Sequence, residues 1–289
     1  MRTSGTTVVS IRGRVRRVAL CGHLVAVAAC GGSGGDLSGP VKNAATPAVG
    51  ESVGSGLKPE RDGFAFPNFG AGVSTEELDG ADLVAKLGSS AEVCKGGVAD
   101  PCVPTAEAAV WARMVNLARQ SGHCEGFAVL AASRFAAKEQ KATIELTQVP
   151  DVTNGIIRAF ATQYLPSVQA ETADWSKKSL ADKVETPYEI ESLDGGVSRI
   201  DVYDSNWPGQ KRFIDVDGES WKFSYSGTDP SNDPDAWTGS SVDFDMTSME
   251  NRLNGTCPFC GADTGVQKTI LVLRSADASW SVSTPDGEL

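Results

Sequence analysis

Histidine is scarce in this chain, which has only His23 and His123 among its 289 residues. A zinc site built from several imidazoles is therefore excluded. So is a histidine that acts as a catalytic base anywhere in the second half of the chain. Since His23 lies in an apolar N-terminal run, His123 is the one histidine in the region that we expect to fold.

Positive charge is also scarce, because 26 lysines and arginines face 37 acidic residues and the net charge is −11. Five of the arginines stand among the first 17 residues, where there is no acidic residue. Binding to nucleic acid needs a basic face, so we expect no nucleic-acid partner. The hydrophobic content of 40% is sufficient for one main folded domain.

Long apolar runs are missing, and residues 18–29 are too few for a settled membrane span. Preceded by the basic lead, this run is typical of a signal peptide over residues 1–29. The sequence Val-Ala-Ala-Cys-Gly at 27–31 resembles the bacterial lipobox, in which the cysteine receives lipid and becomes the mature N-terminus. We therefore expect an extracytoplasmic protein that is anchored to the bacterial cell membrane through lipid at Cys30. Ordinary cleavage, with Cys30 free or paired, is the alternative.

The remaining chain divides into a tether and a domain. Residues 30–62 are rich in Gly, Ser, Ala and Pro and have no apolar periodicity, which predicts a flexible tether. The folded domain is expected at 63–289. Its C-terminal β segment is expected to be incomplete, because the turn at 284–287 has no strand after it.

Cysteine spacing indicates two disulfides in an oxidising compartment. Cys94 and Cys102 stand on either side of a short loop, and Cys257 and Cys260 belong to a Cys-Pro-Phe-Cys sequence. If both pairs close, Cys124 is the thiol left over.

The apolar pattern predicts a helical half followed by a β half, and hence an α+β fold. Four helices are expected: one that starts near Ser74 and continues through 81–87, one after Thr105, one over 124–138, and one from Asn154 to before Pro166. From Tyr188 the apolar period changes to two. The predicted strands include 212–216 paired with 220–225 across an Asp-Gly turn, and a last pair at 269–274 and 279–283.

Cys124 stands at the predicted start of a helix. The helix dipole and the unpaired N–H groups at that end stabilise a thiolate and offer donors to an oxyanion. The same position suits a small buried thiol without reactivity. Both interpretations of Cys124 remain open from the residues alone.

Two sequence blocks carry a resemblance to a known family. The first is Gly-His-Cys-Glu-Gly-Phe-Ala at 122–128, and the second comprises Thr-Pro-Tyr at 186–188 and Tyr-Asp-Ser-Asn-Trp-Pro-Gly at 203–209, with Trp-Lys-Phe at 221–223 after it. These blocks resemble those of bacterial papain-like cysteine peptidases, and the resemblance covers about residues 64–225. It implies a papain-like fold, in which the helix that begins with the cysteine packs on an antiparallel β half.

The resemblance implies roles by position. Cys124 would be the nucleophile, and Asp204, or less favourably Asn206, would orient the base. Lys183 stands where the family has its catalytic histidine. That histidine is missing here.

Other residues near the nucleophile allow alternatives. Gln120 and Asn116 precede Cys124, where papain-like enzymes keep an oxyanion-hole amide, although both equally suit a solvated helix face. For the base, the alternatives are His123 with unusual backbone geometry, or Lys183 with a pKa lowered by burial.

The first hypothesis is therefore a cell-envelope lipoprotein whose papain-like centre is degenerate and whose role is binding or structural, with a peptide or protein as ligand. The alternatives are an active cysteine hydrolase with an unorthodox base, and a thiol-redox protein that uses Cys257 and Cys260. No cofactor and no metal are expected. The Cys-x-x-Cys sequence lacks two further zinc ligands and is favoured as a structural disulfide, and the acidic loop at 229–235 misses the spacing of a calcium site.

Overall fold

The protein is a mixed helix-and-sheet structure, as the α+β prediction requires. The computed structural model describes residues 10–15, 24–28, 48–50, 52–70, 76–178, 189–220, 222–225, 238–239, 244–261, 278–284 and 287–288. The chain forms two compact units: unit 1 comprises Met1–Gly22 and Thr264–Leu289, and unit 2 comprises His23–Asp263.

Unit 1 is a small antiparallel sheet. Its strands are β1 (Ser10–Val15), β10 (Ala278–Thr284) and β11 (Gly287–Glu288). Strand β1 pairs with β10 along its whole length, from Ser10 opposite Ser283 to Val15 opposite Ala278. The predicted strand at 279–283 is thus confirmed, and β11 is a short further strand at the C-terminal end, where no strand was expected. The predicted strand at 269–274 lies outside the described residues.

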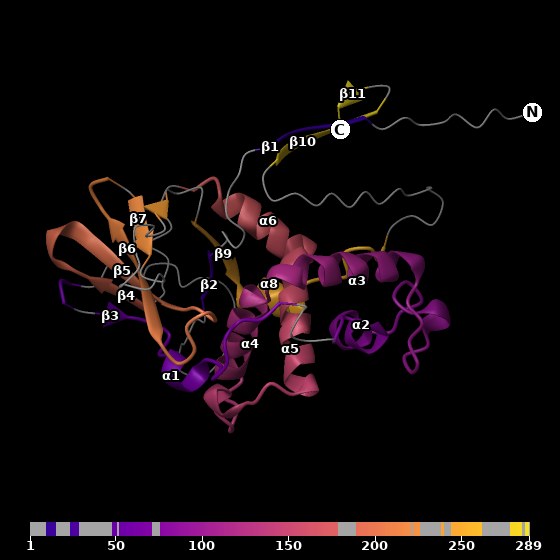
Figure 1. Cartoon of the computed structure of the whole chain (residues 1–289), viewed down its shortest axis with the longest axis horizontal. Helices are drawn as coiled ribbons and strands as arrows, with labels where there is room; N and C mark the ends of the chain where they lie inside the picture. Colours follow the sequence, from indigo (N-terminus) through magenta and orange to yellow (C-terminus); the bar gives the residue numbers. More distant parts are fainter. Residues whose placement is uncertain are drawn as a thin grey trace, which may run out of the picture. The chain divides into compact units, whose positions relative to one another are not determined.

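The helices of unit 2 lie together in Figure 1, apart from most of its strands. They are α1 (Pro59–Asp62), α2 (Gly80–Leu87), α3 (Ala106–Ala118), α4 (Cys124–Ala136), α5 (Pro150–Ala161), α6 (Pro166–Trp175) and α8 (Met249–Asn254). Helix α3 has the predicted cap, because Thr105 Oγ1 accepts the N–H of Ala108. Helix α4 begins at Cys124, as predicted.

Two helix starts differ from the prediction. Helix α2 is capped by Asp79 rather than starting near Ser74, because Asp79 and Asp82 form a reciprocal capping box. Helix α5 starts at Pro150 instead of Asn154, since proline is well suited to the first helical position.

The strands of unit 2 form the predicted β half. The six-stranded sheet has the order β3 (Ser52–Val53), β4 (Glu189–Ser192), β5 (Val197–Tyr203), β6 (Lys211–Asp217), β7 (Lys222–Tyr225) and β8 (Thr238–Gly239). All neighbours are antiparallel. The predicted hairpin is confirmed, with Asp217 opposite Lys222 and Val216 opposite Phe223.

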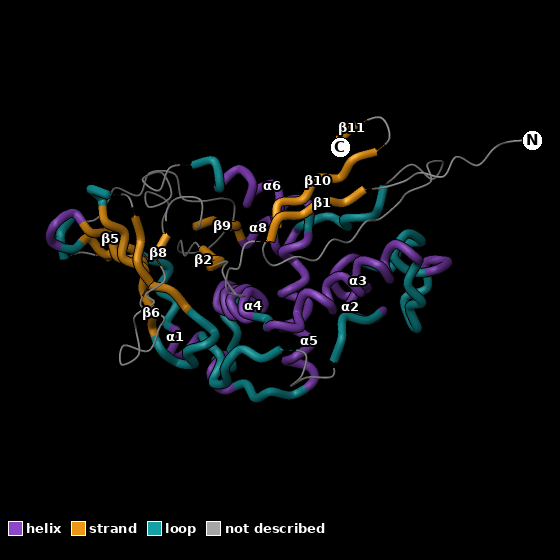
Figure 2. The backbone as a smooth tube through the Cα atoms, turned by 45° about the horizontal axis from the view of Figure 1, so that its top comes forward, coloured by secondary structure: helices purple, strands orange, loops and turns teal. Residues whose placement is uncertain are grey.

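A second sheet in unit 2 has two parallel strands, β2 (Leu24–Ala28) and β9 (Phe244–Ser248). They lie side by side in both backbone views (Figures 1 and 2). Strands β1 and β2 both fall within the segment predicted as a signal peptide, so cleavage before Cys30 would remove them. Strand β3 and helix α1 fall within the predicted tether. The signal peptide stays a prediction, and Cys30 lies outside the described residues.

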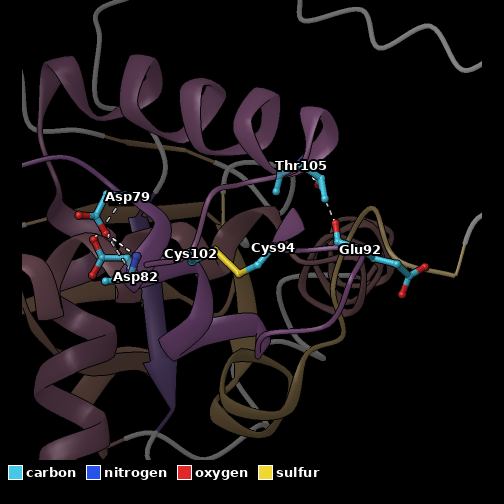
Figure 3. The surroundings of a disulfide bond; sticks show 8 residues. Asp79, Asp82, Glu92, Cys94, Cys102 and Thr105 are labelled. Atoms are coloured by element: carbon cyan, nitrogen blue, oxygen red, sulfur yellow. Dashed lines mark hydrogen bonds between the residues drawn. A yellow bond between two sulfur atoms is a disulfide. The ribbon is translucent and has the colours of Figure 1, made fainter. Parts of the chain in front are cut away.

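Both predicted disulfides are present. Cys94 pairs with Cys102, and Cys257 with Cys260. Figure 3 shows the first bond between two hydrogen-bonded features: the capping box of α2, and Thr105, whose hydroxyl donates to the Glu92 carbonyl at 2.7 Å.

The cysteines contribute to the apolar core beneath α3. Cys94 is fully buried, and Cys102, Cys257 and Cys260 pack against the same cluster, which includes Trp111. The disulfides therefore add cross-links to one core of unit 2.

Candidate cysteine site

The first turn of α4 positions the Cys124 thiol. Cys124 is the first residue of this 13-residue helix, is half-buried, and is outside both disulfides. His123 precedes it as the N-cap residue, and its backbone N–H donates to Asn68 Oδ1 at 2.7 Å. The placement at a helix N-terminus is the one that stabilises a thiolate.

The His123 side chain points into the core instead of serving the thiol. Its ring is fully buried, with Nδ1 at 2.5 Å from the Phe69 carbonyl oxygen and Nε2 at 3.3 Å from a terminal nitrogen of Arg119. Because a guanidinium only donates, Nε2 accepts and Nδ1–H donates to Phe69. Neither ring nitrogen is left to take a proton from Cys124.

Burial also keeps this imidazole neutral. It lowers the pKa of His123 from 6.5 to about 4, against the opposing effect of the Phe69 carbonyl and with a smaller lowering by the Arg119 charge. The ring of Phe69 lies 4.8 Å from that of His123, centroid to centroid. His123 is therefore a neutral structural side chain over the ordinary pH range.

A pH dependence of stability follows from His123. Its pKa is lower in the folded state, so the unfolded state binds more protons between pH 6.5 and about 4. The contribution of His123 to the free energy of unfolding is therefore complete above pH 6.5. It falls by about 3 kcal/mol in total as the pH falls toward 4. Urea unfolding of the wild type and of His123→Asn across this range measures the effect. Asparagine keeps a donor for Phe69 but does not titrate, and equal pH slopes for the two proteins would contradict the assignment.

The turn after β5 carries the predicted orienting residue. Asp204 Oδ1 accepts the backbone N–H of Asn206 at 2.8 Å and its side-chain amide at 3.0 Å, which closes an Asx turn. Asn206 Oδ1 in turn accepts from Asn68 Nδ2 at 3.4 Å. The Asn68 backbone N–H donates to the Ser205 carbonyl at 2.8 Å.

Asn68 thus joins the helical half to the sheet half. The amide oxygen of Asn68 accepts the backbone N–H of His123, which precedes Cys124. Its amide nitrogen donates to Asn206, in the turn that Asp204 closes. Gly122 makes this approach possible, since it has a φ of 144° and a Cβ there would lie 2.6 Å from Asn68 Nδ2. Asn68 was not singled out in the sequence, where its only signal is its place in an aromatic-rich segment.

The remaining residues predicted for the site are Asn116, Gln120 and Lys183, and the structure describes the first two. Asn116 binds both the N–H and the carbonyl of Leu78 through its side chain, at 2.9 and 3.1 Å, and so has a structural role. Gln120 is exposed at the end of α3. Lys183 lies outside the described residues.

A buried ion pair also holds the first turn of α4. Glu125 pairs with Arg252 of α8, whose side chain is 1% exposed. The guanidinium also donates to the hydroxyls of Thr247, at 2.7 and 2.9 Å, and of Thr162, at 3.1 Å. This network has no signature in the sequence, because its members come from separate elements.

Neither a metal site nor a membrane-spanning element is apparent in the described residues. No group of three His, Cys, Asp or Glu side chains there is arranged to hold a metal ion. None of the helices in the same residues has the length and apolarity needed to cross a membrane. In comparisons with known proteins, no family model, no curated protein and no solved structure matches the chain.

Proposed function

We propose that this chain is an extracytoplasmic lipoprotein that uses a papain-like framework to bind a peptide or protein segment, without efficient hydrolysis. The observation that carries the proposal is the state of His123. Its two ring nitrogens are taken by Phe69 and Arg119, and the only other histidine of the chain is His23, in the N-terminal apolar run.

The arrangement of elements supports the papain-like framework. A cysteine begins α4, Asp204 directly follows β5, and strands β4 to β8 of the antiparallel sheet come after helices α1 to α6 in the chain. Asn68 connects the two halves where a papain-like enzyme has its site. These features match the sequence blocks around residues 122–128 and 203–209.

The chemistry argues against efficient hydrolysis. Cleavage of an amide requires a base to activate the thiol and a proton for the leaving amine. A thiol at a helix N-terminus has some thiolate without a base, but it has no group to return the proton. A protein that can no longer return this proton can still bind a peptide. Lipid at Cys30 would hold such a binding protein at the cell envelope, and the two disulfides suit that oxidising compartment.

An active hydrolase is the second candidate, and the half-exposed position of Cys124 at the first residue of α4 favours it. In that case Lys183 would act as the base, with a pKa lowered by burial. The proton would return from Lys183 to the leaving amine.

Thiol labelling and peptide binding test the proposal together. We expect an electrophilic peptidase probe to label Cys124 slowly at neutral pH, at a rate comparable with that of the same thiol in the unfolded protein. A fluorogenic peptide library should show no turnover. Immobilised wild-type protein and Cys124→Ser should retain the same members of that library, whereas Cys124→Arg, which fills the site, should lose them. In a bacterial host, Cys30→Ala should move the protein out of the membrane fraction.

Two results would decide against a binding protein. Rapid labelling near neutral pH that disappears in Cys124→Ala, with peptide cleavage that Lys183→Met abolishes, would establish the hydrolase. Equal peptide retention by wild type and Cys124→Arg would show that peptides do not bind at this site.

A further inference from the structure

Helix α8 connects the Cys257–Cys260 disulfide to the first turn of α4. The helix ends at Asn254, three residues before Cys257, and it carries Arg252. We propose that the Cys257–Cys260 disulfide is a redox switch that controls the reactivity of the Cys124 thiol through α8. The proposal requires only that Cys124 can be labelled, so it does not depend on the proposed function.

The disulfide is open to a reductant. Cys257 and Cys260 are both partly exposed, whereas in the other disulfide Cys102 is partly exposed and Cys94 is fully buried. A thiolate must reach a sulfur atom to exchange with a disulfide. Exchange is therefore less hindered at Cys257–Cys260.

The disulfide shapes a tight turn that is fixed at its far end. Phe259 packs on the ring of Trp111 in α3, with centroids 6.1 Å apart. The Gly261 backbone N–H donates to Glu92 Oε1 at 2.6 Å. The disulfide closes the four residues from Cys257 to Cys260 into a loop. Opening it lengthens the connection between Gly261 and α8, so α8 loses a constraint at its C-terminal end.

Helix α8 is held at its start by buried Met249 and by Asn251 Nδ2, which donates to Glu171 at 2.9 Å, and nearer its end by Arg252. Its side chain binds Glu125, Thr162 and Thr247, and its backbone carbonyl accepts from Lys86 Nζ at 2.6 Å. A shift of the C-terminal turn of α8 therefore moves the Arg252 guanidinium away from Glu125. Buried charged pairs depend steeply on such geometry.

Glu125 follows Cys124 directly in the first turn of α4. While Arg252 neutralises the Glu125 carboxylate, that carboxylate does not oppose a thiolate at Cys124. Once the guanidinium withdraws, the negative charge of Glu125 disfavours the thiolate. Reduction of Cys257–Cys260 should therefore make Cys124 less reactive at neutral pH.

The switching reaction is a thiol–disulfide exchange with a dithiol donor. One donor thiolate attacks a sulfur of Cys257–Cys260, breaks that S–S bond and forms a mixed disulfide. The second donor thiolate then displaces the protein sulfur. The donor ends as a disulfide, and the two electrons and two protons that it loses convert Cys257 and Cys260 to thiols. A disulfide oxidant reverses the exchange.

Alkylation of Cys124, resolved by peptide mass spectrometry, tests the switch. We expect reduction of Cys257–Cys260 by dithiothreitol to slow Cys124 alkylation at pH 7 by about three- to tenfold, as the loss of thiolate outweighs its higher nucleophilicity. Cys257→Ser/Cys260→Ser should be slow without any reductant. This double variant isolates the effect even if dithiothreitol also opens Cys94–Cys102.

Glu125→Gln/Arg252→Met is the matched control, because it keeps the approximate size of both side chains but leaves no charge of the pair to move. In this background the reduced and oxidised proteins should be alkylated at the same rate. An unchanged or faster rate after reduction of the wild type, or a slowing of equal size in Glu125→Gln/Arg252→Met, would overturn the proposal.

Discussion

Arg252→Ala is expected to lower the free energy of unfolding by about 3–5 kcal/mol. The substitution leaves the Glu125 carboxylate, 10% exposed, without the guanidinium that neutralises it. It also removes the donors that bind the hydroxyls of Thr162 and Thr247. Urea unfolding followed by far-ultraviolet circular dichroism measures the change.

Two comparisons make this prediction specific. Lys177→Ala breaks an ion pair with Asp174 in which both side chains are 74% exposed, and it should cost less than about 0.5 kcal/mol. Replacing both charges of the buried pair, in Glu125→Gln/Arg252→Met, should cost less than Arg252→Ala alone, because no charge then stays buried. A loss below about 1 kcal/mol for Arg252→Ala would contradict the buried network.

Gly126→Ala should destabilise the protein by about 2–3 kcal/mol. Gly126 lies in the first turn of α4, where the helix touches α5. A Cβ there would be 2.3 Å from the Ile156 carbonyl oxygen and 2.9 Å from Phe160 Cβ. The two helices would have to separate, which outweighs the gain of about 1 kcal/mol that alanine brings to a helix.

Gly155→Ala is the matched control on the facing helix α5. A Cβ at Gly155 would meet the flexible tips of Leu130, at 3.2 Å, and of Arg158, at 4.0 Å. Alanine should therefore leave stability unchanged or raise it by up to about 1 kcal/mol. Thermal unfolding of the two variants compares the positions directly, and equal effects would show that close packing of α4 on α5 does not depend on Gly126.

Local signals in the sequence were sufficient for much of the fold. Helix α3 has a threonine cap and helical apolar spacing, and the hairpin of β6 and β7 has an Asp-Gly turn between alternating strands. The short spacings in both cysteine pairs predicted the disulfides. In each case the residues that determine the structure are neighbours in the chain.

Elements that depend on distant partners were missed. Helix α6 is polar along the chain, yet Val168 and Trp175 are buried, and Glu171 binds the Ser248 backbone N–H and hydroxyl at 2.8 and 3.1 Å. These contacts with the start of α8 hold a helix that propensity alone does not predict. No spacing within residues 166–175 reveals them.

Some features of the candidate site could likewise be predicted from the sequence, and others could not. The placement of Cys124 at a helix start was predictable, since apolar residues recur after it at helical spacing. The inward orientation of His123 was not, because it depends on Phe69 and Arg119, and the link through Asn68 requires the turn after β5.

The Arg252 contacts also influence the order in which the protein folds. Arg252 binds Thr162, which lies 90 residues earlier in the chain, so this contact closes a long loop. Helices α4 and α5 are synthesised before α8, and their mutual contact is local in the chain, so it forms quickly. The first turn of α4 receives its compensating cation only after α8 has emerged. A chain interrupted before residue 252 would therefore expose the first turn of α4 with Glu125 lacking its Arg252 partner, and chaperones and proteases would meet this form first.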